Sequence, residues 1–135
     1  MAWVVDTCLL LDVLDDDPSF GERSARLIDR HHPDGLIICP VTMIEMAPAF
    51  LGDWRRAAEF VKQVGIDLRE GWTPDDTRAA FSAWHRHVEQ KRLGKSARRP
   101  VADIQIGAFA LRHQGLLTRN VRDFARWFPT LKLPE

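Results

Sequence analysis

Short apolar runs alternate along the chain with longer segments in which apolar residues recur every three or four positions. The short runs are continuous and bounded by turn residues, which is typical of strands that are buried on both faces of a parallel sheet. These predicted strands are residues 2–5, 36–39, 66–68, 115–118 and 131–133. Their alternation with helical patterns predicts an α/β domain in which a mostly parallel central sheet is flanked by α-helices.

The segments between the predicted strands have the apolar spacing of amphipathic helices. Helices are expected over residues 8–14, 19–32, 42–52, 53–64, 74–93, 101–114 and 121–128. Thr42 and Glu45 have the spacing of a capping box, which would start one of these helices, and Pro48 should break that helix early. Gly115 is expected to close the helix over residues 101–114.

Large apolar residues on two of these helices are expected to point into the core. The inner face of the helix over 53–64 begins with Trp54, and that of the helix over 74–93 contains Ala80, Phe81, Trp84 and Val88. For Trp54 and Phe50 there is an alternative place, an exposed apolar groove that would accept a helical segment of a partner.

The composition is that of an ordinary globular protein. The 135 residues are 45% hydrophobic and 28% charged, which fits one domain whose core needs neither disulfides nor a structural metal. Cys8 and Cys39 each lie beside an apolar run and are expected to be free, buried thiols. No apolar run approaches the ~20 residues that span a bilayer, and the first residues lack the features of a secretory signal. The sequence therefore predicts a cytoplasmic protein that does not associate with a membrane.

Charge favours no class of partner when summed over the chain, because 19 basic and 19 acidic side chains cancel. Residues 85–99 are nevertheless strongly basic and contain a single Glu, whereas residues 12–17 are acidic. A basic stripe of this kind suits a polyanion such as RNA. A solvated helix face followed by a loop explains the same composition, so both interpretations stay open.

Four carboxylates from separate segments fall where the carboxyl ends of the predicted strands meet, the edge at which parallel sheets bind ligands. They are Asp6, Glu45, Asp103 and Asp123. Each could instead cap or begin a helix of its own. Converging carboxylates repel one another unless a cation neutralises them, and Mg²⁺ or Mn²⁺ prefers oxygen ligands of this kind. Such metals support phosphodiester hydrolysis, so the cluster predicts a metal-dependent nuclease.

Four motifs occur in order across nearly the whole chain. They are VVDTCLLLD (4–12), PVTMIE (40–45), RRPVADIQIGAFA (98–110) and LLTRNVRDF (116–124). Together they resemble a PIN domain, specifically a VapC-type ribonuclease toxin of a bacterial type II toxin–antitoxin (VapBC) pair, and the last two motifs are the most specific. The resemblance implies a single PIN domain over residues 1–135 and an endoribonuclease activity that depends on Mg²⁺ or Mn²⁺.

The resemblance also assigns roles to individual residues. The acidic metal ligands and catalytic residues are Asp6, Glu45, Asp103 and Asp123, and the polar positions beside them are Thr7, Thr118 and Asn120. Cys8 departs from the family pattern, in which Asn or Ser is common. The implied partners are a VapB-like antitoxin that covers the site and an RNA substrate (tRNA, rRNA or mRNA). DNA would be contacted only through the antitoxin, and a homodimer is left open.

Three arginines are expected to contact RNA phosphates, with a solvated loop as the alternative: Arg98, Arg99 and Arg119. Two other functions are alternatives to the nuclease. The first is a module that keeps the PIN scaffold and binds RNA or a protein without catalysis. The second is an α/β phosphohydrolase with Asp6 as the nucleophile, but such enzymes usually carry a second Asp at the position that Cys8 occupies.

Overall fold

The structure is a computed structural model that describes residues 1–69, 71–91 and 100–135. Its central feature is a four-stranded parallel sheet in the order β3-β2-β1-β4. Its strands are β1 (Trp3–Val5), β2 (Leu36–Ile37), β3 (Ile66–Asp67) and β4 (Gly115–Leu117). β1 lies between β2 and β4, with Val4 aligned with Ile37 on one side and with Leu116 on the other. The predicted α/β architecture is confirmed.

Helices connect these strands and follow the last one. They are α1 (Thr7–Leu14), α2 (Gly21–His31), α3 (Pro40–Met46), α4 (Trp54–Gln63), α5 (Pro74–Lys91), α6 (Val101–Leu111) and α7 (Val121–Trp127), with short 3-10 turns η1 (His32–Asp34) and η2 (Ala47–Phe50). None of the described helices is long and apolar enough to cross a membrane. Residues 92–99, which include Arg98, Arg99 and the predicted end of a helix at Leu93, lie outside the described residues.

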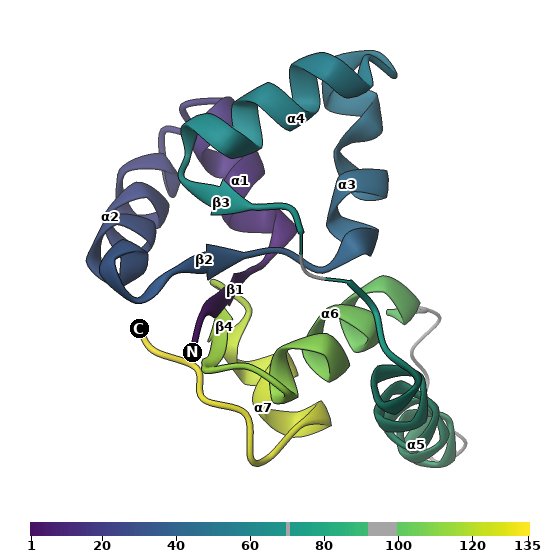
Figure 1. The fold of residues 1–135 in the computed structure, drawn as a ribbon. Helices are drawn as coiled ribbons and strands as arrows, with labels where there is room; N and C mark the ends of the chain where they lie inside the picture. Colours follow the sequence, from purple (N-terminus) through teal and green to yellow (C-terminus); the bar gives the residue numbers. More distant parts are fainter. Residues whose placement is uncertain (70, 92–99) are drawn as a thin grey trace.

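The domain has three layers, with α1 to α4 on one side of the sheet and α5 to α7 on the other (Figure 1). This follows from the strand pattern, because successive residues of a strand point to opposite faces. Val5 and Leu36 belong to the apolar core against α1 to α4, whereas Val4 and Ile37 belong to the second core against α5 to α7. Continuous apolar runs therefore serve both cores at once.

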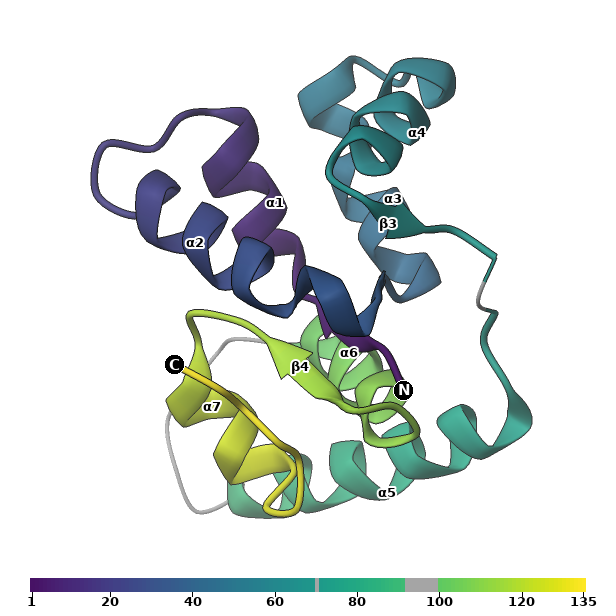
Figure 2. The same cartoon turned by 60° about the vertical axis from the view of Figure 1, so that its left-hand side comes forward.

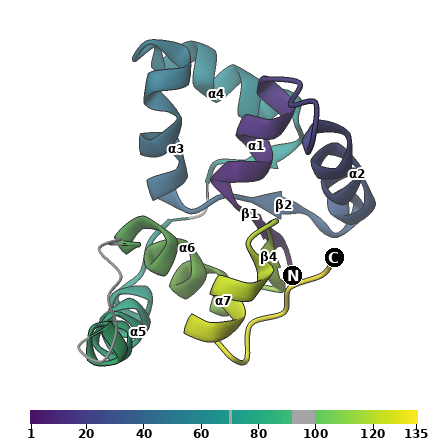
Figure 3. The same ribbon diagram turned by 180° about the vertical axis from the view of Figure 1, so that it is seen from behind.

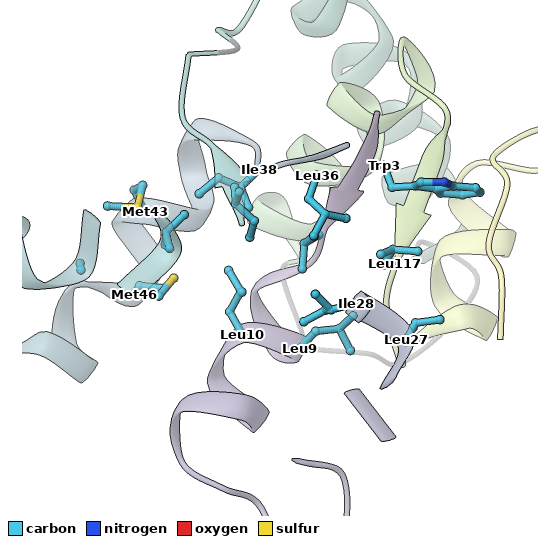
Figure 4. Packing of buried hydrophobic residues seen from close by; sticks show 14 of the residues in the cluster. Trp3, Leu9, Leu10, Leu27, Ile28, Leu36, Ile38, Met43, Met46 and Leu117 are labelled. Atoms are coloured by element: carbon cyan, nitrogen blue, oxygen red, sulfur yellow. The ribbon is translucent and has the colours of Figure 1, made fainter. Parts of the chain in front are cut away.

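The first core brings α1 and α2 onto the centre of the sheet. Leu9 of α1 lies together with Leu27 and Ile28 of α2, beneath Leu36 and Leu117 of the strands (Figure 4). All of these side chains are nearly or fully buried. Their packing fixes the start of α1. Because a single residue separates the end of β1 from the start of α1, this packing also sets the position of Asp6, which lies between the two elements.

Three predicted boundaries are wrong. The capping box fails because α3 begins at Pro40, so Thr42 lies inside the helix and is fully buried. α6 ends at Leu111, and Gly115 is the first residue of β4 with Trp3 and Lys132 closely packed against its backbone. Residues 131–133 form no strand, although the N–H of Leu116 donates to the carbonyl of Lys132 at 2.9 Å.

Two predicted inward-facing residues point to solvent instead. Phe81 on α5 is 74% exposed and Trp54 on α4 is 65% exposed. On α5 the buried positions are Asp76, Ala83 and His87, of which two are polar and therefore invisible to an apolar pattern. The buried Phe50 does not share the exposure of Trp54, so the predicted groove containing both is not present as an open surface.

Candidate active site

Asp6 occupies the junction between β1 and α1, at the carboxyl end of the central strand. Its N–H donates to the carbonyl of Leu117 at 2.9 Å, so the residue is anchored to β4. The side chain is almost fully buried and accepts two hydrogen bonds at Oδ2, from the hydroxyl of Thr118 at 2.6 Å and from the thiol of Cys8 at 3.2 Å. Thr118 therefore contacts Asp6 directly, while its role in a functional site stays a prediction.

The environment of Asp6 opposes its negative charge. Burial, the largest influence, raises the pKa of Asp6 above its ordinary value, although the hydrogen bonds from Thr118 and Cys8 act to lower it. The nearby carboxylate of Glu45 raises the pKa further. Asp6 forms no ion pair with any described cationic side chain. A carboxyl group that is buried, hydrogen-bonded on one oxygen and near a second carboxylate is chemically suited to a divalent cation, which would reverse this shift.

Glu45 is linked to the same site through α1. Its Oε1 accepts a hydrogen bond of 2.7 Å from the hydroxyl of Thr7, the residue after Asp6. The hydroxyl of Thr7 also lies 3.0 Å from that of Thr42, so the contact joins the starts of α1 and α3. Thr7 and Thr42 are buried, whereas Glu45 is exposed and can be reached from solvent. These contacts tie the exposed carboxylate of Glu45 to the residue that follows Asp6.

Asp103 and Asp123 lie on the other side of the sheet, each in the first turn of a helix. Asp103 is on α6 and Asp123 on α7, and both are partly buried. Nη2 of Arg126 lies 3.5 Å from Oδ1 of Asp123, in a partly exposed pair. Seen from behind, α1 and α3 lie on one side of β1, and α6 and α7 on the other (Figure 3).

The four carboxylates do not form a closed ligand set in this structure. Within residues 1–69, 71–91 and 100–135, no group of three or more His, Cys, Asp or Glu side chains is arranged to hold a metal ion. The structure couples Asp6 electrostatically to Glu45, and it places Asp103 and Asp123 in the first turns of α6 and α7. The metal site composed of all four residues stays a prediction.

The turn after β4 is tied to the site by its backbone. The N–H of Asn120 donates to the hydroxyl oxygen of Thr118 at 3.0 Å, which leaves the Thr118 proton directed at Asp6. The Cys8 thiol lies 3.8 Å from the same hydroxyl. Burial and the adjacent Asp6 raise the pKa of Cys8 to about 12, so this residue is a neutral donor.

Arg119 has a partner that the sequence did not reveal. Its Nε donates to Oδ2 of Asp12 at 2.9 Å and its Nη2 to Oδ1 at 3.2 Å, while its guanidinium lies 4.5 Å from the ring centre of Phe20. The hydroxyl of Ser24 donates to Asp12 at 2.8 Å. A possible signal was the position of Asp12 in the apolar run CLLLD, since a buried acid needs a partner. Contact between Arg119 and RNA stays a prediction.

Comparison with known proteins agrees with this architecture. Residues 3–127 match the model of the PIN domain family. The chain belongs to the PIN domain family.

A solved structure has the same fold along the whole chain. The chain superposes on one from the crystal structure of VapBC2 from Rickettsia felis bound to a DNA fragment from their promoter, with a TM-score of 0.66 and 14% sequence identity over 99% of this chain and 98% of that one. Likeness at this identity concerns the fold alone. A search of curated proteins found no match.

Proposed function

We propose that this protein is a metal-dependent endoribonuclease that acts in the cytoplasm as the toxin of a VapBC-type pair. The observation that carries the proposal is Asp6, a carboxyl group buried at the end of the central strand, held by Thr118 and Cys8 and coupled to Glu45. Such a group is costly to ionise without a cation. Membership of the PIN domain family supports the interpretation that this buried carboxyl group serves a nuclease active site.

Asp6, Glu45, Asp103 and Asp123 would hold Mg²⁺ or Mn²⁺. The bound metal would lower the pKa of a water molecule and neutralise charge on the phosphate. Thr118 occupies Oδ2 of Asp6 and thereby leaves the other oxygen for the cation, while Thr7 restrains the carboxylate of Glu45. The protein residues therefore supply position and negative charge to the reaction.

A VapB-like antitoxin is the proposed partner. The VapBC2 structure contains such a pair on promoter DNA, so contact of this chain with DNA is proposed to be indirect. Three large apolar side chains on α3, α4 and the turn between them are exposed: Ile44, Leu51 and Trp54. An amphipathic helix of the antitoxin would cover them, as is usual for exposed apolar surface of this kind. A homodimer stays a prediction.

The test is cleavage of total tRNA and rRNA by the purified protein in Mn²⁺, in Mg²⁺ and in EDTA. Asp6→Asn should abolish the discrete fragments, whereas Asp75→Asn, which removes an exposed carboxylate on α5, should leave them unchanged. Circular dichroism of both variants checks that the fold is intact. Fragments produced equally by Asp6→Asn would refute the assignment of the site.

A binding module without catalysis is the second candidate. It is favoured by one observation, namely that no three acidic side chains among the described residues are arranged to hold a metal. This candidate predicts that growth inhibition persists in Asp6→Asn and that RNA is bound but not cleaved. The nuclease predicts that inhibition is lost together with cleavage.

A further inference from the structure

An arginine-rich pocket of about 360 Å³ opens beside the candidate active site. Its lining residues come mainly from α2 on one side and from the turn after β4 with the start of α7 on the other. Figure 2 shows these segments close to each other. The arginines that line it are Arg23, Arg26, Arg30, Arg119 and Arg122, and Glu135 is the one acidic residue among its lining residues. Because the whole chain has 19 basic and 19 acidic residues, this concentration of positive charge is local and suits an anion.

Asp12, an acidic residue in contact with the lining of this arginine pocket, is already paired with one of its arginines. Asp12 accepts hydrogen bonds from both Arg119 and Ser24, which are lining residues, and it is buried beneath them. Its charge therefore does not oppose an incoming phosphate at full strength. One arginine is committed to Asp12, and the net charge of the pocket stays positive.

Two arginines on opposite walls are available for a ligand. Arg23 on α2 and Arg122 on α7 are exposed and form no hydrogen bond or ion pair within the described parts of the chain. Arg30 uses one nitrogen to donate to the carbonyl of Glu135 at 3.1 Å, and Arg26 has a weak exposed pair with Glu22 at 3.8 Å. Guanidinium groups with free donors bind phosphate oxygens in a planar, bidentate manner.

The pocket also has an apolar part and a direct connection to Asp6. Phe20 and Val121, which are half-buried, line it before α2 and at the start of α7, and Thr118, whose hydroxyl donates to Asp6, lines it from the turn after β4. A volume of about 360 Å³ lies at the lower end of the range for small-ligand sites. Apolar lining with a rim of arginines matches a nucleotide, which has a flat apolar face and a charged phosphate.

We propose that the arginine pocket holds one nucleotide of the RNA substrate next to the bond that is cleaved, with its phosphate between Arg23 and Arg122. The proposal rests on the proposed nuclease function and adds a subsite to it. Thr118 joins the two, since its hydroxyl donates to Asp6 and the residue is among those that line the pocket.

The test measures how tightly the full chain binds a fluorescent eight-nucleotide single-stranded RNA, by anisotropy in EDTA so that the RNA is not cleaved. The variant is Arg23→Ala/Arg122→Ala, and the matched control is Arg56→Ala/Arg78→Ala, which removes the same charge from exposed positions on α4 and α5. We expect about tenfold weaker binding by the variant, and a salt dependence of log K that is shallower by about 0.7 for each phosphate that the variant no longer neutralises. The control should bind as wild type does.

Competition separates a nucleotide site from a simple anion site. 5′-AMP should displace the RNA from wild type at a lower concentration than inorganic phosphate does, and the variant should lose this difference. The proposal is overturned if wild type binds no RNA, if both double variants lose affinity equally, or if the arginine variant binds RNA as wild type does.

Failure of the pocket and failure of the nuclease give different results. Metal-dependent cleavage with unchanged RNA affinity in the arginine variant overturns the subsite alone. RNA binding that depends on Arg23 and Arg122, in a protein that never cleaves, refutes the nuclease and supports the pocket. In an active enzyme the arginine variant should raise KM with little change in kcat, because these arginines hold the RNA equally well in the bound and transition states.

Discussion

Replacing Thr118 with valine tests the hydrogen bond that holds Asp6. Valine has nearly the same shape as threonine, so the change removes the 2.6 Å bond to Oδ2 of Asp6 and also the acceptor of the Asn120 N–H, without opening a cavity. Thr118 and Asp6 are both buried, so water cannot easily replace the missing partner. In the variant, the Cys8 thiol is the remaining side-chain hydrogen-bond donor to the buried carboxylate of Asp6.

The size of the loss follows from the charge of the acceptor. A hydrogen bond to a charged group contributes about 1.5–3 kcal/mol, whereas a bond between neutral groups contributes about 1 kcal/mol. We therefore expect Thr118→Val to lower the free energy of unfolding by about 2–3 kcal/mol at pH 7.5 without metal. Thr118→Ser keeps the hydroxyl and should lose about 1 kcal/mol for the missing methyl group.

The loss should depend on pH with a definite sign. The pKa of Asp6 is raised in the folded protein, first by burial. The folded state therefore holds this proton more tightly than the unfolded state, and stability falls as the pH rises from the unfolded pKa through the folded one. Thr118→Val raises the folded pKa further, so its penalty should be larger at pH 7.5 than at pH 4.5. Because Thr118→Ser keeps the bond, its penalty should change little with pH.

Urea unfolding followed by circular dichroism at the two pH values, with EDTA present, measures these differences. The reasoning is refuted if the valine variant is as stable as wild type at pH 7.5. It is equally refuted if the serine variant loses as much as the valine variant, or if the loss in the valine variant is the same at both pH values.

Three further predictions concern other parts of the fold. Arg112→Ala should lower the free energy of unfolding by about 3 kcal/mol at pH 7. Burial acts to raise the pKa of Asp76, but hydrogen bonds, chiefly from Arg112, lower it overall. The stability that the Asp76–Arg112 pair contributes is therefore lost as the pH falls below about 4. Gly107→Ala should destabilise by about 1–3 kcal/mol in thermal unfolding, since an added methyl group collides with the Phe128 ring. Iodoacetamide at pH 8 should alkylate Cys8 slowly in the folded protein and readily in urea, measured by mass spectrometry, because its pKa is raised to about 12.

Each of these three has its own contrary result. An Arg112→Ala penalty as large at pH 3 as at pH 7 would show that the pair does not act through the charge of Asp76. An unchanged melting temperature for Gly107→Ala would show that the Phe128 ring can move aside at no cost. Rapid alkylation of folded Cys8 would show that the thiol is accessible and ionised.

The strands could be predicted from the sequence because each is a continuous apolar run that must serve two cores. Val4 and Val5, for example, point to opposite cores although they are neighbours. Their predicted burial required no knowledge of partners. The position of Asp6 followed from the same pattern, since a carboxylate that ends an apolar run stands at the edge of the sheet.

What failed depended on contacts between distant residues. The spacing of Thr42 and Glu45 suggested a local cap, but both side chains face Thr7, 35 and 38 residues away. On α5 the buried positions Asp76 and His87 are polar, and Asp76 is buried because Arg112 reaches it from the end of α6. A pattern of apolar residues does not reveal buried polar positions, and for this reason the predicted inward orientation of Phe81 was wrong. The burial of these positions depends on contacts with residues distant in sequence, and the spacing of apolar residues contains no information on such contacts.

The hydrogen bond between Asp6 and Thr118 determines when the candidate active site can form during synthesis of the chain. The two residues are 112 positions apart in sequence, and they meet when β4 docks beside β1. At a synthesis rate of 5–20 residues per second, about 6–22 s pass between the emergence of the first residue and the second. Contacts of such long sequence separation also form slowly. A chain still on the ribosome therefore carries Asp6 without the hydroxyl that holds it in the folded protein, and the candidate active site stays incomplete throughout most of synthesis.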